Sequence, residues 1–234
     1  MRGISRKNIS IILIAAGILM VAAAIAITAG WKIAQLELLG KSAADRAERL
    51  QAEGKNAEVR ETEPGLEEQG KDNEAGGKAS GAVEGQENKL HIPGLQRQDY
   101  SDGSMIISIP RLKVTAAVVD GTEEEVLKKG PGLYEISPLP GEEEGNICIA
   151  GHRTSYGAWF AKIDRLSEGD DIILEFGGFK FIYKVEKVFA VYKKDWSVTK
   201  PAGYPAVTLT TCHPPGSAEQ RLVARGRLAE IKPE

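Results

Sequence analysis

A cysteine near the end of the chain is the residue best placed for chemistry. Cys212 closes an alternating stretch with Val207 and Leu209 on one face and Thr208, Thr210 and Cys212 on the other. This two-residue period predicts a strand with one apolar and one polar face. A cysteine that only fills a core belongs on the apolar face. Cys212 is therefore a candidate nucleophile.

A thiol needs a neighbouring base, because a free cysteine with a pKa of about 8.5 is only slightly ionised at neutral pH. Of the three histidines, His91 lies in a long polar stretch, and His213 would point to the opposite face of a continuing strand. His152 follows the apolar segment 146–150, where loops commonly carry catalytic groups. It is the predicted partner of Cys212, and a plain surface histidine in a turn is the alternative.

Acyl transfer also needs a group that stabilises an oxyanion, and an arginine can do this. A Pro-Pro-Gly break separates the cysteine segment from a second alternating segment, which begins near Arg221. If residues 213–220 form a hairpin loop, Arg221 falls opposite Cys212. Arg225 would lie about 13 Å further along the strand. We therefore assign the oxyanion role to Arg221 and expect Arg225 and Arg227 to be solvated or paired with glutamates.

The remaining composition excludes several classes of protein. Two cysteines are too few for a disulfide-stapled scaffold, and Cys148 is expected to be a buried core residue rather than a disulfide partner of Cys212. The acidic runs at 123–125 and 142–144 lack the ordered spacing of a calcium loop, so no metal or other cofactor is predicted. A net charge of −3 gives no argument for a nucleic-acid partner.

The N-terminal region predicts a membrane anchor. Residues 1–8 form a basic head, and residues 9–33 are an apolar run whose only charge is Lys32. About 20 apolar residues span a bilayer, and the positive residues of the head favour a cytoplasmic N-terminus with the rest of the chain outside. A cleaved signal peptide is the alternative, although this run is longer than the usual signal core.

Residues 34–103 are expected to form an acidic, flexible stalk. Glu, Lys, Gln, Gly, Ala and Asn dominate, and this composition cannot bury enough apolar surface to offset the entropy of ordering. A helix over 36–51 is expected to leave the membrane, and the glycine-containing stretches beyond it favour a flexible linker.

Residues 104–234 are expected to form one mainly β domain. Strands are expected at 105–109, 114–120 and 146–150, as a hairpin around Gly177 and Gly178, and in the two segments around Cys212 and Arg221. Short helices are expected after a Thr122 cap and over 156–166. Seven or eight strands with few helices predict a closed or nearly closed, antiparallel-rich barrel.

Three of these motifs together resemble a known family. Thr208-Leu-Thr-Thr-Cys212 resembles the TLxTC signature of the sortases, and Ala150-Gly-His152-Arg resembles their histidine motif. Arg221, nine residues after the cysteine, resembles their arginine. The likeness covers residues 104–231, and the sequences around His152 and Cys212 are similar to the class D and class E enzymes.

The resemblance implies a membrane-anchored cysteine transpeptidase of a Gram-positive cell surface, built on a sortase-like barrel. By that likeness, Cys212 attacks the threonine carbonyl of an LPxTG-like sorting signal, His152 protonates the leaving amine, and Arg221 stabilises the oxyanion. An amine, usually from a peptidoglycan precursor, then resolves the acyl-enzyme. Thr208, Leu209 and Thr211 of the signature are assigned to substrate binding.

Two other functions compete with this one. An L,D-transpeptidase-like enzyme would also transfer acyl groups through a cysteine, but that family usually shows Ser-His-Gly-Cys at its nucleophile. A stalked surface binding module would use the cysteine and histidine only structurally. The place of Cys212 on the polar face argues against that second alternative.

Overall fold

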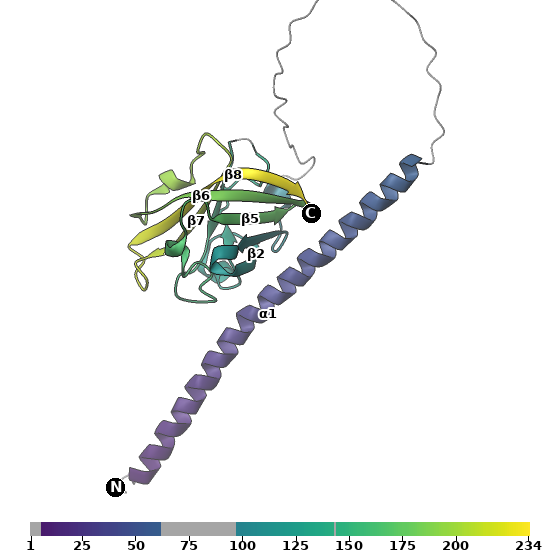
Figure 1. Ribbon diagram of the computed structural model, residues 1–234. Coiled ribbons are helices and arrows are strands. Elements are labelled where there is room, and N and C mark those ends of the chain that lie inside the picture. The colour runs from purple at the N-terminus through teal and green to yellow at the C-terminus, as the bar shows by residue number, and fades with distance from the viewer. Residues whose placement is uncertain (1–5, 62–96, 143) are drawn as a thin grey trace, which may run out of the picture.

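The computed structural model describes residues 6–61, 97–142 and 144–234. Figure 1 shows a β-barrel lying beside one long helix. The helices are α1 (Arg6–Glu61) and α2 (Glu124–Leu127), with 3₁₀ turns η1 (Arg97–Asp99), η2 (Pro110–Leu112), η3 (Ile163–Arg165) and η4 (Trp196–Thr199). The strands are β1 (Met105–Ile109), β2 (Val114–Asp120), β3 (Gly132–Leu133), β4 (Asn146–Ala150), β5 (Asp171–Phe176), β6 (Phe179–Tyr192), β7 (Ala206–His213) and β8 (Gln220–Pro233).

The eight strands close into a barrel in the order β1-β2-β3-β4-β7-β8-β6-β5. All neighbours pair antiparallel except β2 with β3 and β4 with β7, which are parallel. The prediction of a closed, antiparallel-rich barrel is confirmed, as is the β5–β6 hairpin around Gly177 and Gly178. The parallel β4–β7 pair matters for function, because it places the ends of both strands at the same end of the barrel.

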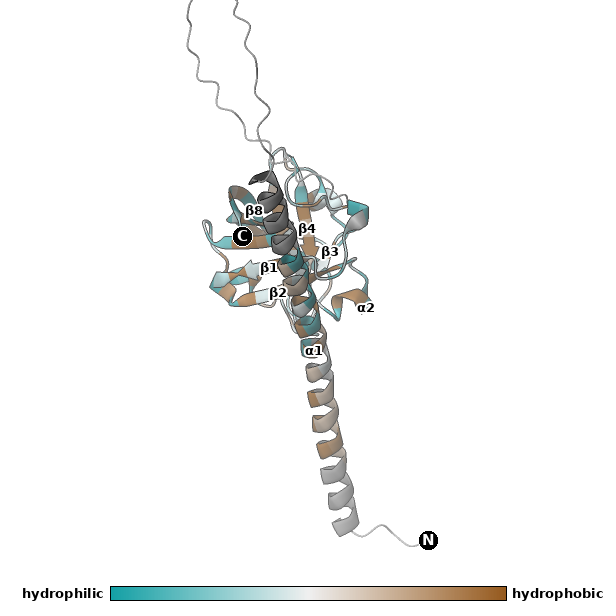
Figure 2. Ribbon diagram, turned by 90° about the vertical axis from the view of Figure 1, so that its right-hand side faces the viewer, coloured by the Kyte–Doolittle hydropathy of each residue, from teal (hydrophilic) through white to brown (hydrophobic). Residues whose placement is uncertain are grey.

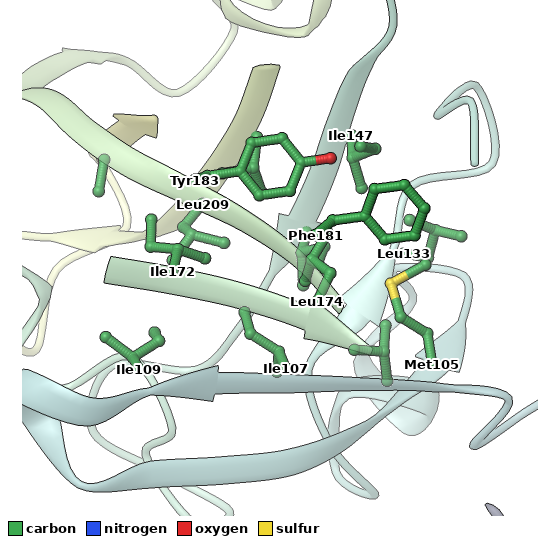
Figure 3. Packing of buried hydrophobic residues seen from close by; sticks show 14 of the residues in the cluster. Met105, Ile107, Ile109, Leu133, Ile147, Ile172, Leu174, Phe181, Tyr183 and Leu209 are labelled. Carbon is green, nitrogen blue, oxygen red and sulfur yellow. The ribbon is translucent and has the colours of Figure 1, made fainter. Parts of the chain in front are cut away.

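Alternate side chains of the strands fill the inside of the barrel, which Figure 3 shows from close by. Along β1 and β5 every second residue is buried, as a half-buried strand requires. The largest enclosed side chains are Tyr183, Phe160, Phe181 and Met105. On β7, Val207 and Leu209 belong to this core, while Thr208 and Thr210 do not. The outer face of β7, which carries Cys212, is therefore the polar one.

Helix α1 packs against β1 and β2, and Figure 2 shows it crossing these strands. In this contact Gln35 of α1 is hydrogen-bonded to Ala117 of β2 and is only 3% exposed. The helix extends ten residues beyond the predicted end at residue 51. Residues 62–96 of the predicted stalk, including His91, lie outside the described residues.

No helix among the described residues is both long and apolar enough to cross a membrane. The first part of the predicted anchor, residues 9–15, lies outside the residues whose side chains are described.

Two local predictions were wrong. Residues 156–166 do not form a helix, because Tyr156, Gly157 and Ala158 all have positive φ angles (46°, 88° and 45°), which interrupt a right-handed helix. The apolar spacing had a different cause, since Phe160, Ile163 and Leu166 are core residues on a chain of turns and one 3₁₀ segment. Helix α2 begins after Glu123, whose side chain makes no capping hydrogen bond, so Thr122 is not its cap.

Candidate active site

Cys212 and Arg221 form a directly opposed pair in the antiparallel β7–β8 ladder. The predicted hairpin register is therefore confirmed. Opposed residues in such a ladder have Cα atoms about 4.5–5.5 Å apart. Cys212 is a free thiol and is partly exposed.

His152 follows β4, which pairs with β7 on the side away from β8. In the parallel β4–β7 pair, Ala150 is level with Thr210, and the Gly151 amide donates to the Thr210 carbonyl at 3.0 Å, which extends the ladder by one step. The paired residues end there, and His152 and Cys212 each follow two residues after this last pair, Ala150 and Thr210. Neighbouring strands lie about 4.8 Å apart. The structure thus pairs Cys212 with Arg221 and brings the segment that carries His152 to the same end of the barrel.

Gly151 holds the histidine loop close to the cysteine strand. Its carbonyl oxygen accepts a hydrogen bond from the Thr211 hydroxyl at 2.6 Å, in addition to the bond made by its amide. A Cβ atom at this position would stand 2.6–3.0 Å from atoms of the Phe160 ring. The Phe160 amide in turn donates to the His152 carbonyl at 3.2 Å. A glycine is therefore required where β4 passes into the loop.

The environment of His152 favours the neutral imidazole. Burial lowers its pKa below the ordinary value of 6.5; the negative charge of Glu124 opposes this shift, and the positive charge of Lys128 adds to it. Its ring lies against that of Tyr156, with centroids 5.2 Å apart. The Nε2 atom is shielded from solvent and has no hydrogen-bond partner among the described residues. A neutral ring with an unused nitrogen can accept the proton of a neighbouring thiol.

The guanidinium of Arg221 is held by its own turn. Its Nη1 donates to the carbonyl oxygens of Ala218 and Gln220, both at 3.0 Å. The side chain is half-buried, where a positive charge acts more strongly than in open water.

Tyr134 is a further polar residue at the site that the sequence analysis missed. Its hydroxyl is 2.8 Å from the hydroxyl of Thr210, two residues before Cys212 on the same face. Burial raises its pKa, while the hydrogen bond to Thr210 and the positive charge of Arg221 oppose this shift. Its ring meets that of the exposed Trp196 edge to face, with centroids 6.4 Å apart. The two aromatic side chains stand above the outer face of β7.

A buried polar network fixes η4, which carries Trp196, over β4, β7 and β8. Asn146 donates from Nδ2 to the carbonyls of Val198 and Lys200, both at 2.9 Å, and accepts from the Thr208 hydroxyl at 2.7 Å. Arg225 donates to the Val198 carbonyl at 2.6 Å and to the Thr208 hydroxyl at 3.2 Å. The expectation that Arg225 is solvated or paired with a glutamate was wrong, because its guanidinium binds two oxygens, the carbonyl of Val198 and the hydroxyl of Thr208.

The other assigned residues fall in covered positions. Leu209 has no exposed surface and lies in the core, while Thr208 is enclosed in the η4 network and Thr211 is bound to Gly151. Their assignment to substrate binding stays a prediction.

Cys148 is buried and unbridged, but it faces η4 rather than the inside of the barrel. Arg227 pairs with Glu186 as expected, at 2.8 Å. Among the described residues, no three His, Cys, Asp or Glu side chains gather as metal ligands.

Comparison with known proteins identifies the family. The model of the sortase domain matches residues 107–229, which is more than half of the chain. The chain belongs to the sortase family. The match begins within β1 and ends within β8, so it includes every strand of the barrel and all three residues of the site.

The relatives of this sortase include class D and class E proteins. Sortase SrtE1 of Streptomyces coelicolor is 30% identical over 146 residues, covering 56% of this chain and 42% of the relative. Sortase D of Bacillus subtilis is 31% identical over 135 residues, covering 56% of this chain and 66% of the relative. The chain thus spans about two fifths to two thirds of these relatives. The predicted similarity to classes D and E is confirmed.

Solved sortase structures share the barrel. The structure of sortase E1 from Streptomyces coelicolor, with a tripeptide in its active site, matches with a TM-score of 0.53 at 25% identity and covers 57% of this chain and 94% of that one. Sortase E from Streptomyces avermitilis matches with a TM-score of 0.50 at 34% identity, covering 55% of this chain and 89% of that one.

Proposed function

We propose that this protein is a membrane-anchored cysteine transpeptidase that cleaves LPxTG-like sorting signals and joins the released protein to a cell-wall amine. The observation that carries the proposal is the direct pairing of Cys212 with Arg221, on a strand whose other neighbour, β4, leads into the segment that carries His152. A nucleophile, a neutral base and a fixed cation are the groups that acyl transfer requires. A sortase E1 structure that holds a tripeptide in its active site supports a peptide substrate.

In the acylation step, the Cys212 sulfur attacks the threonine carbonyl carbon of the sorting signal, and its proton passes to His152. The carbonyl oxygen becomes an oxyanion beside Arg221, whose positive charge stabilises it. As the peptide C–N bond breaks, His152 returns the proton to the leaving amine. The product is a thioester between the threonine carbonyl and Cys212.

In the second step, an acceptor amine attacks the thioester and His152 takes up its proton. The C–S bond breaks, the sulfur leaves, and the proton returns to it, which restores the thiol of Cys212. An amine of a peptidoglycan precursor is the proposed acceptor, and water in its place would give hydrolysis. Because the same histidine serves both steps, it must gain and lose a proton, and burial, which lowers its pKa, favours the neutral form that begins each step.

We also propose that residues 9–33 anchor the protein in the cell membrane, with the N-terminus in the cytoplasm and the barrel outside. The apolar composition of this run and the basic residues before it support the anchor. Apolar side chains of α1 within the run are also largely exposed, among them Leu19 at 73% and Met20 at 74%. Such a surface is unfavourable in water and favourable in lipid.

Intact mass spectrometry of the full-length chain tests the transpeptidase. The protein is incubated with LPxTG-like and LAxTG-like peptides without an added amine. We expect an added mass equal to the N-terminal fragment of one peptide, and its loss as an amide product when an amine is supplied. This result would also identify the preferred sorting signal.

Two cysteine variants provide the controls. Cys212→Ala should form no adduct, whereas Cys148→Ala should form it normally, because Cys148 is buried away from the site. An adduct that persists in Cys212→Ala would place the nucleophile elsewhere. No adduct with any peptide, together with a Cys212 that resists alkylation in the folded protein, would favour the structural binding module instead.

A further inference from the structure

Helix α1 contacts the barrel at the edge of β2, through the side chain of Gln35. Because β3 pairs with β2 only at Val119 and Asp120, the edge at Ala117 lies beyond that ladder. Gln35 takes the place of a neighbouring strand there. Its Oε1 accepts from the Ala117 amide at 2.9 Å, and its Nε2 donates to the Ala117 carbonyl at 3.2 Å. A buried amide with both ends bonded in this way is a specific contact rather than a loose one.

The same side chain also holds the segment that follows α2. Gln35 Nε2 donates to the Lys129 carbonyl at 2.6 Å. The Lys129 amide donates to the Val126 carbonyl at 2.9 Å, so the residue whose carbonyl Gln35 binds belongs to the turn that ends α2. At Gly130, a Cβ atom would collide with Gln35 Nε2, so the absence of a side chain there lets the glutamine reach the turn. Gln35 therefore fixes the end of α2 relative to the barrel.

Helix α2 in turn borders the catalytic histidine. The Lys128 ammonium lies over the Tyr156 ring, 5.4 Å from its centroid, and the Tyr156 ring packs on His152. The charges of Glu124 and Lys128 both act on the imidazole. Tyr156 has a positive φ of 46°, a strained conformation for this residue that its surroundings must maintain. The connection thus runs from Gln35 to Lys129, through the chain to its neighbour Lys128, and on through Tyr156 to His152.

We propose that Gln35 is a positioning residue of the active site: by docking α1 on the turn after α2, it holds Lys128 and Tyr156 in the places that orient the His152 ring. The role in catalysis rests on the proposed function, whereas the docking does not. Gln35 lies two residues beyond the predicted anchor, so the segment that leaves the membrane would itself complete the site. Any change in the docking of α1 would then change the reactivity of Cys212.

The rate of Cys212 alkylation by iodoacetamide, measured across pH on the full-length chain, tests this without knowledge of the substrate. Peptide mapping separates Cys212 from the buried Cys148. We expect Gln35→Ala to slow the reaction about three- to ten-fold near neutral pH, the scale of a coupling through several contacts. Gly130→Ala should act in the same direction, because the added methyl group would collide with the Gln35 amide and displace it. Lys41→Ala, an exposed position on the same helix, should leave the rate unchanged.

A double-mutant cycle separates positioning from simple stabilisation. If Gln35 acts through α2, Lys128→Ala slows alkylation in the native background but adds little in the Gln35→Ala background. If Gln35 only stabilises the fold, Lys128→Ala has the same factor in both backgrounds, and the proposal is overturned. Thermal unfolding shows that each variant is folded at the assay temperature.

The alkylation and acyl-enzyme measurements can fail independently, so they distinguish the positioning role of Gln35 from the proposed function. A protein that forms no acyl-enzyme with any peptide but shows the Gln35–Lys128 coupling would lack the proposed activity and retain the positioning. A protein that forms the acyl-enzyme while Gln35→Ala and Gly130→Ala alkylate at the native rate would be a transpeptidase whose site does not depend on α1.

Discussion

Cys212 and Arg221 face each other across the β7–β8 ladder, nine residues apart in the chain. The turn between them fixes this pairing, because only one further pair, His213 with Gln220, separates it from the point where the chain reverses. Arg225 and Arg227 lie progressively further along β8, opposite Thr208 and Ala206. Of the three arginines on this strand, Arg221 alone is paired with the candidate nucleophile.

Replacement of Arg221 should therefore impair acylation selectively. We expect Arg221→Ala to slow acyl-enzyme formation by about 10² to 10³, the scale for the loss of an oxyanion donor. Rapid-quench mass spectrometry of the adduct measures the rate. Arg227→Ala is the matched control, since Arg227 is exposed and binds Glu186 on the far part of the strand. Normal acylation by Arg221→Ala would refute the assigned role.

The lowered pKa of His152 predicts the acidic limb of the pH profile. In the proposed mechanism the free enzyme needs a neutral imidazole, so kcat/KM should fall with decreasing pH only below 6.5. Burial is the main cause of the shift, and the Lys128 charge contributes to it. Peptide cleavage rates between pH 5 and pH 8 would show the limb. A limb well above 6.5 would mean that a group other than a neutral His152 controls the acidic limb.

The same shift has a consequence for stability. Between the folded pKa of His152 and 6.5, the unfolded chain binds more protons at this residue than the folded chain does. Its contribution to the free energy of unfolding therefore falls as the pH decreases through that window. In His152→Gln this part of the pH dependence should be absent, which denaturant unfolding at pH 5 and pH 7 can measure.

Much of the fold and the three central residues could be predicted because the relevant signals are local. Two-residue alternation gave the strands, and the Pro-Pro-Gly turn set the register that pairs Cys212 with Arg221. His152 was accessible because it follows an apolar strand directly. These signals depend on residues within about ten positions of one another, so they survive in a single sequence.

The parts that could not be predicted depend on contacts between distant segments. Gln35 meets Ala117 across 82 residues, and nothing near either position indicates it. Arg225 looked like a solvated residue because its partner Val198 lies on η4, a short turn without a periodic pattern. The apolar spacing at Phe160, Ile163 and Leu166 indicated a helix. The positive φ angles at residues 156–158, which the spacing does not reveal, prevent one from forming.

Gly151 should not tolerate a side chain. In Gly151→Ala the new methyl group would stand 2.6–3.0 Å from the Phe160 ring, so either the ring or the His152 loop must move. Overpacking of this kind costs about 1–3 kcal/mol of stability. We expect slower acylation together with a lower unfolding midpoint. Gly40→Ala is the control, because a Cβ atom there meets nothing within 4 Å. A Gly151→Ala protein with native rate and stability would show that the loop adapts freely.

Arg225 should stabilise the fold although it is not the catalytic arginine. Its hydrogen bonds to Val198 and Thr208 tie η4 to the barrel, and loss of a charged donor to a partly buried carbonyl costs about 1.5–3 kcal/mol. Arg225→Ala should therefore lower the free energy of unfolding, and Arg225→Lys should recover part of it, because lysine keeps the charge but cannot reach both oxygens with a planar fork. Denaturant unfolding measures both changes.

Arg227→Ala, two residues away with an exposed partner, should have a much smaller effect. Equal effects of the two alanine variants would mean that the η4 network adds nothing to stability, and that Trp196 is held beside Tyr134 by other contacts.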